Sequence, residues 1–312
     1  MNKIPVVVLV GPTASGKTSL AVKLCQACNG EVVSGDSMQI YRGMDIGTAK
    51  PTEEEKGGIP HHLLDIADVS ENYSVARFCT DAAEAVADIY GRNKLPVIAG
   101  GTGLYIDSFL QNTPFAEQGD VTDLRASLRE EYDRDGGESL YREITEKDPE
   151  AAAKIHPHNA VRVIRAVELL RSGQTLTGQV ARTKETESPY RALRLFLDFE
   201  NRQTLYDRID RRVDAMMESG LLDEAKRLYD RRDTLGKTAK AAIGYKELFS
   251  YFDGECTLSE ATERIKAATR HYAKRQLTWF RRDQTAVRLE ASLPIEENLK
   301  KAQELTKNLL FL

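Results

Sequence analysis

The sequence predicts an α/β fold in which a parallel sheet is flanked by helices and carries an all-helical insertion. Two observations lead to this prediction. Short apolar segments alternate with helical segments up to residue 113, and strands that alternate with helices form parallel sheets with right-handed crossovers. Residues 114–190 then show one helical pattern after another without a convincing strand. We therefore divide the chain into a first core part, 1–113, the insertion, 114–190, and a core remainder with C-terminal helices, 191–312.

The first part of the core repeats one plan. Residues 4–10 are apolar and mostly β-branched, as in a strand buried on both faces of a sheet, and a helical segment follows them. Residues 31–37 and 95–103 each combine a short apolar strand with an end rich in Gly, Ser, Asp or Thr. Between them, residues 74–93 have helical spacing, and Gly91 is the expected stop.

The insertion and the C-terminal part are predicted to be mainly helical. The clearest helical segments of the insertion are 123–134, 138–147 and 158–173. Residues 191–199 are expected to add a further core strand. From Thr204 to the end we expect helices alone, with breaks near Gly236 and Gly254.

A glycine-rich loop separates the first strand from the first helix and completes the P-loop pattern GxxxxGK(S/T). It consists of Gly11, Pro12, Thr13, Ala14, Ser15, Gly16, Lys17 and Thr18. In this context the loop amides, the helix N-terminus and Lys17 surround a phosphate, and Thr18 can bind Mg²⁺. The loop predicts a P-loop NTPase-like sheet, and by itself it suggests nucleotide binding, most often of ATP.

Polar residues at two further strand ends are expected beside this loop. Asp36 and Ser37 follow the second strand, and Gly100, Gly101 and Thr102 follow the third. Ligands of open α/β sheets bind beyond the carboxyl ends of the strands, so we expect one shared crevice. A carboxylate opposite a phosphate cradle suits a magnesium ligand or a general base. The alternative for Asp36 is a turn or a helix cap.

An NTP-dependent kinase for a small molecule is one interpretation of the P-loop. Its magnesium-binding acid could be Asp198, but the strand that ends there follows the long insertion, and the third strand ends without an acid. We also see no motif that would read a nucleobase. These missing parts count against a kinase.

Six segments closely resemble the bacterial tRNA dimethylallyltransferases, also called tRNA isopentenyltransferases. In chain order they are residues 11–18, 36–51, 61–66, 100–110, 243–248 and 269–282. The resemblance is weakest in 115–150 and in the last thirty residues, and the chain departs from the usual family sequence at His271 and Tyr272. It implies that a dimethylallyl group moves from its pyrophosphate to the exocyclic amine of the adenosine on the 3′ side of the anticodon. The P-loop would then hold the donor's pyrophosphate.

The resemblance also implies roles for individual residues. Asp36 would be the general base that takes a proton from the amine, and Thr102 would orient the nucleotide. Lys17, the loop amides and Mg²⁺ on Thr18 would stabilise the departing pyrophosphate. Arg208 and Arg212 lie one helical turn apart, and we favour Arg208 as the catalytic arginine near the pyrophosphate, against the alternative of two solvated charges.

A basic segment, residues 264–282, contains no acidic residue. On a helical wheel, Ile265, Ala268, Tyr272 and Trp279 gather on one side, and Arg270, Lys274 and Arg281 gather on the other. A surface helix would explain the apolar side, but a face of one charge sign suits a polyanion such as RNA, with an affinity that falls steeply with salt. The residues expected to contact tRNA are Asp36, Ser37, Met38, Gln39, Thr102, Arg162, Arg165, Lys246, Arg270, Lys274 and Arg281.

Composition limits the remaining possibilities. The net charge of −4 argues against a dedicated nucleic-acid-binding domain, so RNA binding must be local. No stretch approaches the roughly 20 apolar residues of a membrane span. The four cysteines are scattered, which fits a reducing cytoplasm, and we interpret Cys25 and Cys28 as a buried helix face and not a metal site.

We therefore expect a cytoplasmic monomer, without a membrane partner, that uses Mg²⁺, dimethylallyl pyrophosphate and the anticodon stem-loop of tRNA. Two alternatives remain beside the kinase. A relative could alkylate free adenine nucleotides, which would need no basic RNA surface. A nucleotide-dependent binding module without catalysis would leave Asp36 unexplained.

Overall fold

The computed structural model describes residues 3–115 and 122–310, which form two compact units. The α/β unit comprises the described residues up to Leu110 and from Pro189 onward, and the helical unit comprises the described residues of Gln111–Ser188. The sequence placed the insertion at residues 114–190; residues 116–121 of it lie outside the described part.

The α/β unit contains a six-stranded sheet in the order β3-β2-β4-β1-β5-β6, in which each neighbouring pair is parallel. The strands are β1 (Ile4–Val10), β2 (Gly30–Ser34), β3 (His61–His62), β4 (Leu95–Gly100), β5 (Tyr190–Asp198) and β6 (Val287–Glu290). Val10 at the end of β1 pairs with Gly100 of β4 on one side and with Phe196 of β5 on the other. The predicted parallel α/β fold is confirmed.

The two edge strands are not among the strands predicted from the sequence. The region after Thr204 is not helical throughout, because Val287–Glu290 forms β6 against β5. His61 and His62 form β3 against β2. Both strands are very short, so their sequences contain too few residues to show a strand pattern.

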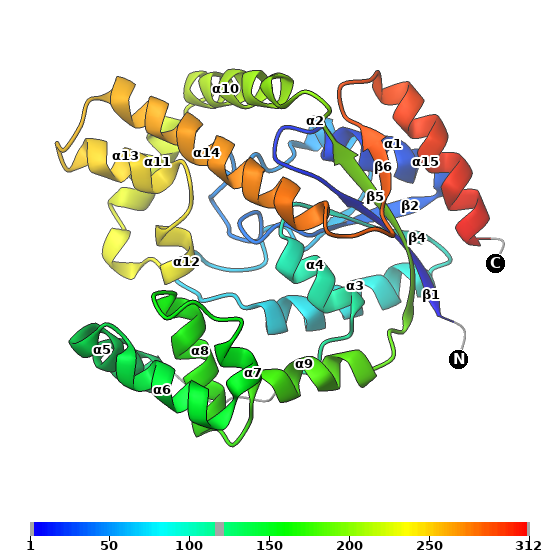
Figure 1. The fold of residues 1–312 in the computed structure, drawn as a ribbon. Helices are drawn as coiled ribbons and strands as arrows, with labels where there is room; N and C mark the ends of the chain where they lie inside the picture. Colours follow the sequence, from blue (N-terminus) through cyan, green and yellow to red (C-terminus); the bar gives the residue numbers. More distant parts are fainter. Residues whose placement is uncertain (1–2, 116–121, 311–312) are drawn as a thin grey trace. The chain divides into compact units, whose positions relative to one another are not determined.

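Helices cover both faces of the sheet (Figure 1). Near the sheet these are α1 (Lys17–Cys28), α2 (Glu53–Lys56), α3 (Val75–Gly91), α4 (Gly103–Leu110) and α15 (Ile295–Leu310). α1 packs with α15, and α3 packs with α4 on the other face (Figure 1). Further helices are α10 (Arg202–Glu218), α11 (Leu221–Tyr229), the 3₁₀ turn η1 (Arg232–Thr234), α12 (Lys237–Lys240), α13 (Tyr245–Phe252) and α14 (Leu258–Phe280). α14 packs against α10 and α13, and none of the described helices combines the length and hydrophobicity that a bilayer crossing requires.

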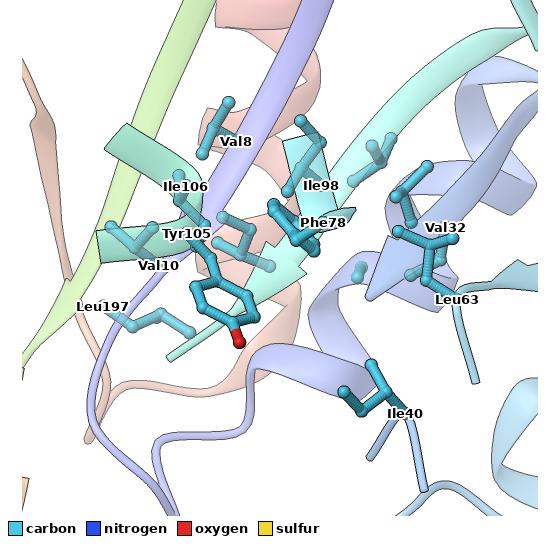
Figure 2. Close-up of a cluster of buried hydrophobic side chains, with 14 of the residues drawn as sticks. Val8, Val10, Val32, Ile40, Leu63, Phe78, Ile98, Tyr105, Ile106 and Leu197 are labelled. Carbon is cyan, nitrogen blue, oxygen red and sulfur yellow. The ribbon is translucent and has the colours of Figure 1, made fainter. Parts of the chain in front are cut away.

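A buried apolar cluster holds α3 and α4 against the strands (Figure 2). Val8 of β1, Ile98 of β4 and Phe78 of α3 are completely inaccessible to solvent, at 0% exposure. The rings of Phe78 and Tyr105 pack with their centroids 4.8 Å apart. Burial of a side chain of this kind stabilises the fold by about 1.5–3 kcal/mol, so this cluster keeps the strand ends, and the loops that follow them, in fixed positions.

The helical unit has its own hydrophobic core. It contains α5 (Thr122–Asp135), α6 (Glu138–Lys147), α7 (Pro149–Ala152), α8 (Ala160–Arg171) and α9 (Leu176–Glu185). The core includes Leu128, Leu140 and Val163, each with 0% exposure. Glu168 is buried nearby and accepts hydrogen bonds from the guanidinium groups of Arg125 and Arg165.

Candidate active site

The P-loop connects β1 to α1, and two of its residues have a left-handed backbone conformation. Ala14 and Gly16 have left-handed φ angles of 61° and 85°. Glycine adopts this conformation without strain, whereas alanine does so at a cost. A Cβ atom at Gly11 would lie 2.7 Å from the carbonyl oxygen of Leu197, so a side chain there would push the loop away from β5.

The inside of the P-loop contains a buried polar atom that suits an anion. The Oγ atom of Ser15 is buried and has no hydrogen-bond partner among the described residues. Buried hydroxyl groups are normally hydrogen-bonded, so this donor needs an acceptor that enters the loop. A phosphate oxygen meets that need. The amide of Thr13 is held differently, because it donates to Gln276 Oε1 at 2.8 Å.

Two cations meet at the P-loop. Lys17 Nζ donates to the carbonyl oxygen of Pro12 at 2.7 Å, and burial lowers the pKa of Lys17 to about 7. Asp36 raises this pKa and Arg212 lowers it further. Burial also lowers the pKa of Arg212, whose Nη1 atom lies 3.5 Å from Thr13 Oγ1. Partly desolvated cations of this kind favour an anion with several charges, such as a pyrophosphate.

The structure places Arg212, and not Arg208, beside the P-loop. Arg208 donates from Nη1 to the carbonyl oxygen of Ala291 at 3.0 Å, and its guanidinium lies 5.3 Å from the centre of the Phe199 ring. The choice of Arg208 from the sequence is therefore corrected. Helical spacing showed that both arginines lie near the same face, but it carried no information about where each long side chain extends.

Asp36 and Thr102 come together because two loops are in backbone contact. A Cβ atom on Gly100 would lie only 2.2 Å from the carbonyl oxygen of Gly35, so this approach requires glycine. The amide of Thr102 donates to the same Gly35 oxygen at 3.1 Å. Thr102 Oγ1 in turn accepts a bond from the amide of Ser37 at 3.0 Å and donates to Ser37 Oγ at 3.2 Å.

The Asp36 carboxylate is oriented by its own loop. Its Oδ1 atom accepts a hydrogen bond from the amide of Met38 at 2.9 Å, and its side chain lines a cavity of about 480 Å³. Ser37 and Met38 line the same cavity. An oriented carboxylate that faces a cavity can accept a proton from a bound substrate.

The cavity combines polar and apolar walls. Thr13, Asp36, Arg212, Arg275 and Gln276 give it polar groups. Its apolar walls come mainly from α10 and α14 and include Ile209, Val213, Met216, Ile265 and Ala268. Such a lining accommodates a ligand with a charged head and a small hydrocarbon group.

Gln39 has an internal role that the sequence did not reveal. Its Nε2 atom donates to the carbonyl oxygens of Thr48 and Ala49 at 3.2 and 3.1 Å, and its Oε1 atom accepts from Ser34 Oγ at 3.1 Å. The side-chain amide thus ties the loop after β2 to the cavity wall at residues 48–49. The contact of Gln39 with tRNA stays a prediction, and its polar atoms are used within the fold.

Glu224 is a further site residue that sequence reasoning missed. Its carboxylate is buried, with 1% exposure, and accepts bonds from three successive amides, those of Asp45, Ile46 and Gly47, each at 3.0 Å. The hydroxyl of Tyr245 donates to the same carboxylate at 2.7 Å. Glu224 thereby anchors the loop whose residues Gly47, Thr48 and Ala49 form part of the cavity wall. In the sequence it is simply one acid on an amphipathic helix.

Acids from other elements neutralise part of α14. Lys266 pairs with Asp214 of α10 at 2.7 Å, and Arg270 pairs with Asp210 of α10 at 2.5 Å. Although residues 264–282 contain no acid, acids of α10 therefore neutralise the charges of Lys266 and Arg270. The expectation for Arg270 as an RNA contact is weakened accordingly, because its charge already has a partner in the fold.

Arg281 and the apolar side of α14 also differ from the helical wheel. Arg281 pairs with Asp198 at 2.8 Å, so the acid that a kinase would use for magnesium is engaged in an ion pair. The buried positions include Gln276, Leu277 and Phe280, whereas Trp279 is 36% exposed. The wheel placed Trp279 on the buried side, because it treats all residues of a helix as though one uniform surface covered them.

The other predicted RNA contacts lie in different places. Lys246 of α13 lines the cavity, and Lys274 of α14 is exposed. Arg162 and Arg165 lie on α8 of the helical unit; Arg162 is exposed, and Arg165 pairs with Glu168. Thr13, Asp36 and Lys246 thus line one cavity. Lys17 interacts electrostatically with Asp36, and Thr102 is hydrogen-bonded to Ser37 of the cavity wall.

Thr18 is the second residue of α1, next to Lys17, where a magnesium ion bound to a phosphate would be expected. Mg²⁺ sites of this type use one or two protein oxygens, and substrate phosphates and water complete the shell. Within residues 3–115 and 122–310, no group of three or more His, Cys, Asp or Glu side chains could hold a metal by itself. The Thr18 hydroxyl therefore fits an ion that arrives with its phosphate ligand, whose oxygens the orphan Ser15 hydroxyl can bind.

Comparison with known proteins decides between the remaining interpretations. The model of the family described as "IPP transferase" matches residues 39–283. The chain belongs to the IPP transferase family. A tRNA dimethylallyltransferase from Bacillus subtilis (strain 168) is 47% identical to this IPP transferase over 305 residues, which are 98% of this chain and 96% of the relative. One from Halalkalibacterium halodurans is 50% identical over 282 residues, which are 89% and 88% of the two chains.

Solved structures of IPP transferases have the same fold. The crystal structure of a full-length tRNA isopentenylpyrophosphate transferase from Bacillus halodurans matches with a TM-score of 0.73 and 44% identity, and covers 99% of this chain and 97% of that chain. A eukaryotic dimethylallyltransferase acting on tRNA matches with a TM-score of 0.81 and 29% identity, over 97% of this chain and 80% of that chain.

Proposed function

We propose that this chain transfers the dimethylallyl group of dimethylallyl pyrophosphate to tRNA and releases pyrophosphate. The acceptor is the exocyclic amine of the adenosine on the 3′ side of the anticodon. One observation carries the proposal: Thr13 of the P-loop, the cation Arg212, the oriented carboxylate of Asp36 and an apolar wall line a single cavity, and Lys17 interacts electrostatically with both Asp36 and Arg212. The family's tRNA dimethylallyltransferases support the choice of donor and acceptor.

The donor's two halves suit the two kinds of cavity wall. Thr13 and Arg212 of the cavity wall, together with Lys17 and Ser15 Oγ of the adjoining P-loop, bind the pyrophosphate, and the apolar residues of α10 and α14 enclose the five-carbon group. An allylic carbon loses pyrophosphate when the leaving anion is stabilised and water is excluded. Lys17 and Arg212 stabilise that anion in an environment where their charges are only weakly screened.

Magnesium is proposed as a companion of the donor. The Thr18 hydroxyl would hold the ion together with oxygens of the pyrophosphate. When bound, the ion would supply additional positive charge to the leaving group. The protein's own share is to place the pyrophosphate against Lys17 and Ser15.

The acceptor adenine enters the same cavity after leaving the stack of the anticodon loop. Asp36 takes the proton that the amine loses as the new carbon–nitrogen bond forms, and Thr102 positions the nucleotide. Ser37, Met38 and Lys246 line the cavity around the base and its neighbours. The exposed cations Lys274 and Arg162 are proposed to contact phosphates of the anticodon stem-loop. We further propose that the enzyme acts as a monomer in the cytoplasm, where its four free cysteines stay reduced.

The test is to incubate the protein with radiolabelled dimethylallyl pyrophosphate and unmodified tRNA, with AMP and ATP as alternative acceptors. We expect label only in tRNA, at the adenosine next to the anticodon. Asp36→Asn should lower the rate by about 10²- to 10⁴-fold, the usual contribution of a positioned base, while tRNA still binds. Asp233→Asn, at an exposed carboxylate of η1, is the matched control and should behave as the wild type.

Two results would contradict the proposal. Label in AMP or ATP and not in tRNA would favour an enzyme for free nucleotides. A normal transfer rate with Asp36→Asn would remove this carboxylate from the proton transfer.

A further inference from the structure

One face of α14 follows the cavity toward the surface. Tyr272, Arg275 and Gln276 of this face line the cavity. The buried Gln276 connects two loops of the site, since it accepts from the amide of Thr13 at 2.8 Å and donates to the carbonyl oxygen of Gly101 at 3.0 Å. Residues three or four apart lie on the same helix face, so Trp279 is the next residue of this face beyond the cavity.

The Trp279 ring is fixed and yet partly open. Its Nε1 atom donates to Asp107 Oδ2 at 2.6 Å, and the other carboxylate oxygen, Oδ1, is bound by Arg194 at 2.6 Å. The indole lies against the backbone of Gly103, where a Cβ atom would come within 2.4 Å of the ring. Despite these contacts the side chain is 36% exposed. A large apolar ring held in one orientation at the surface loses little conformational entropy when it binds a partner.

The Trp279 ring contacts the residue next to Thr102, which is proposed to position the acceptor. Gly103, on which the indole lies, directly follows Thr102, whose hydroxyl is bonded to the loop of Asp36. A base that neighbours the alkylated adenosine would therefore emerge near the indole. The exposed side chains of Arg275 and Arg282, on either side of Trp279 in the chain, can neutralise the phosphates of such a nucleotide. Single-stranded bases are commonly bound by stacking on aromatic side chains.

We propose that Trp279 is a stacking platform for a base of the anticodon loop that directly neighbours the alkylated adenosine. This inference rests on the proposed function, because it assumes that the acceptor is an RNA loop. It adds a residue that positions the RNA and does not take part in the chemistry. Asp107 and Gly103 are the residues that hold the platform in place.

The first test uses the intrinsic fluorescence of Trp279, which is the single tryptophan of the chain. Anticodon stem-loop RNA is titrated into the wild-type protein, and emission and quenching by acrylamide are measured. Stacking should quench the emission and protect the indole from acrylamide. An RNA that is abasic at the neighbouring position should bind without this change.

The second test is a double-mutant cycle between protein and RNA. Trp279→Ala should weaken binding of the intact stem-loop by about 5- to 150-fold, the range expected for loss of one stacked base, whereas Trp279→Phe should retain most of the affinity. With the abasic RNA, Trp279→Ala should cause no further loss. Leu293→Ala, at another exposed apolar side chain, is the control and should have no effect. Binding of dimethylallyl pyrophosphate should be unchanged in all variants.

The results separate this inference from the proposed function. If the wild type alkylates tRNA but the fluorescence of Trp279 does not change when RNA is added, the stacking platform is wrong. It is also wrong if the losses in affinity caused by Trp279→Ala and by the abasic position are additive. If the wild type alkylates no tRNA, the proposed function itself fails. The fluorescence test needs no variant, so it remains decisive even if Trp279→Ala does not fold.

Discussion

Lys17 is the residue whose charge depends most on what the P-loop holds. Burial lowers the pKa of Lys17 from 10.5 to about 7 in the ligand-free protein, so between these values the unfolded chain binds the extra proton and the folded chain does not. The free energy of unfolding therefore rises with pH across this window, as far as Lys17 contributes. A bound pyrophosphate reverses the balance, because its negative charge favours the protonated amine.

We predict proton uptake when the donor binds. At pH 8 Lys17 is mostly neutral in the free protein, and binding of dimethylallyl pyrophosphate should take up as much as about 0.9 proton on this residue. Calorimetry in two buffers that differ in ionisation enthalpy measures this uptake. Lys17→Met should abolish it, and Lys23→Met, at a half-exposed lysine of the same helix, should not. An equal uptake by the wild type and Lys17→Met would assign the proton to another group.

The two arginines of α10 should have different effects. Arg212→Ala removes a partly buried cation beside Thr13 and should raise the dissociation constant of the donor by about 10- to 100-fold, since hydrogen bonds to charged groups contribute about 1.5–3 kcal/mol. Arg208→Ala removes a contact with Ala291 and should change donor binding much less. Binding of inorganic pyrophosphate to both variants provides the measurement. A larger loss with Arg208→Ala would restore the choice made from the sequence.

At the scale of elements, the loop at residues 44–49 depends on a single buried carboxylate. Glu224→Gln keeps the size of the side chain but replaces one acceptor oxygen with an amide that faces backbone N–H groups. We expect a loss of about 1–3 kcal/mol in the free energy of unfolding, because buried donors lose their acceptor. Tyr245→Phe removes one hydrogen bond to the same carboxylate and should cost about 0.5–1.5 kcal/mol.

Urea unfolding of both variants, together with donor titrations, tests this prediction. The displaced loop should also raise the KM for the donor in Glu224→Gln, because Gly47 and its neighbours form the cavity wall. Glu218→Gln, at an exposed acid of α10, is the control. If Glu224→Gln unfolds at the same urea concentration as the wild type, the anchoring role is wrong.

The sequence predicts the central strands of the sheet but not the contacts between distant residues. The apolar runs within β1, β2, β4 and β5 identified the central strands, because strands buried on both faces are nearly continuously apolar. The P-loop and Asp36, the acid after β2, could be placed close together, because the carboxyl ends of parallel strands lie at one edge of the sheet. The partners of Arg270 and Gln276 could not, because Asp210 and Thr13 are distant in sequence and meet only through packing.

At the scale of the whole molecule, we propose that the two units have different functions: the α/β unit binds the donor, and the helical unit contributes to tRNA binding. Each unit has its own hydrophobic core, and the residues that line the cavity all belong to the α/β unit. The ends of the helical unit are close to each other, because Asn112 Nδ2 lies 3.5 Å from the carbonyl oxygen of Glu187. A short linker can therefore replace the unit without straining the α/β unit.

We predict that replacing residues 111–188 with a short Gly/Ser linker preserves donor binding and weakens tRNA binding. The dissociation constant of dimethylallyl pyrophosphate should stay within about twofold of the wild type, because every residue that lines the cavity belongs to the α/β unit. The affinity for the anticodon stem-loop should fall, since Arg162 is removed with α8. Calorimetry and a filter-binding assay measure the two affinities. Loss of donor binding in a folded variant, or an unchanged affinity for tRNA, would contradict this division.

The contact of Gly35 with Gly100 has a consequence for how such an enzyme can change during evolution. Any side chain at position 100 would separate the segment that carries the carboxylate from the segment that carries Thr102. Natural evolution or laboratory selection for a new acceptor therefore cannot change one of these segments independently of the other. We expect variants that use a new acceptor to arise when residues 35–39 and 100–103 are exchanged together.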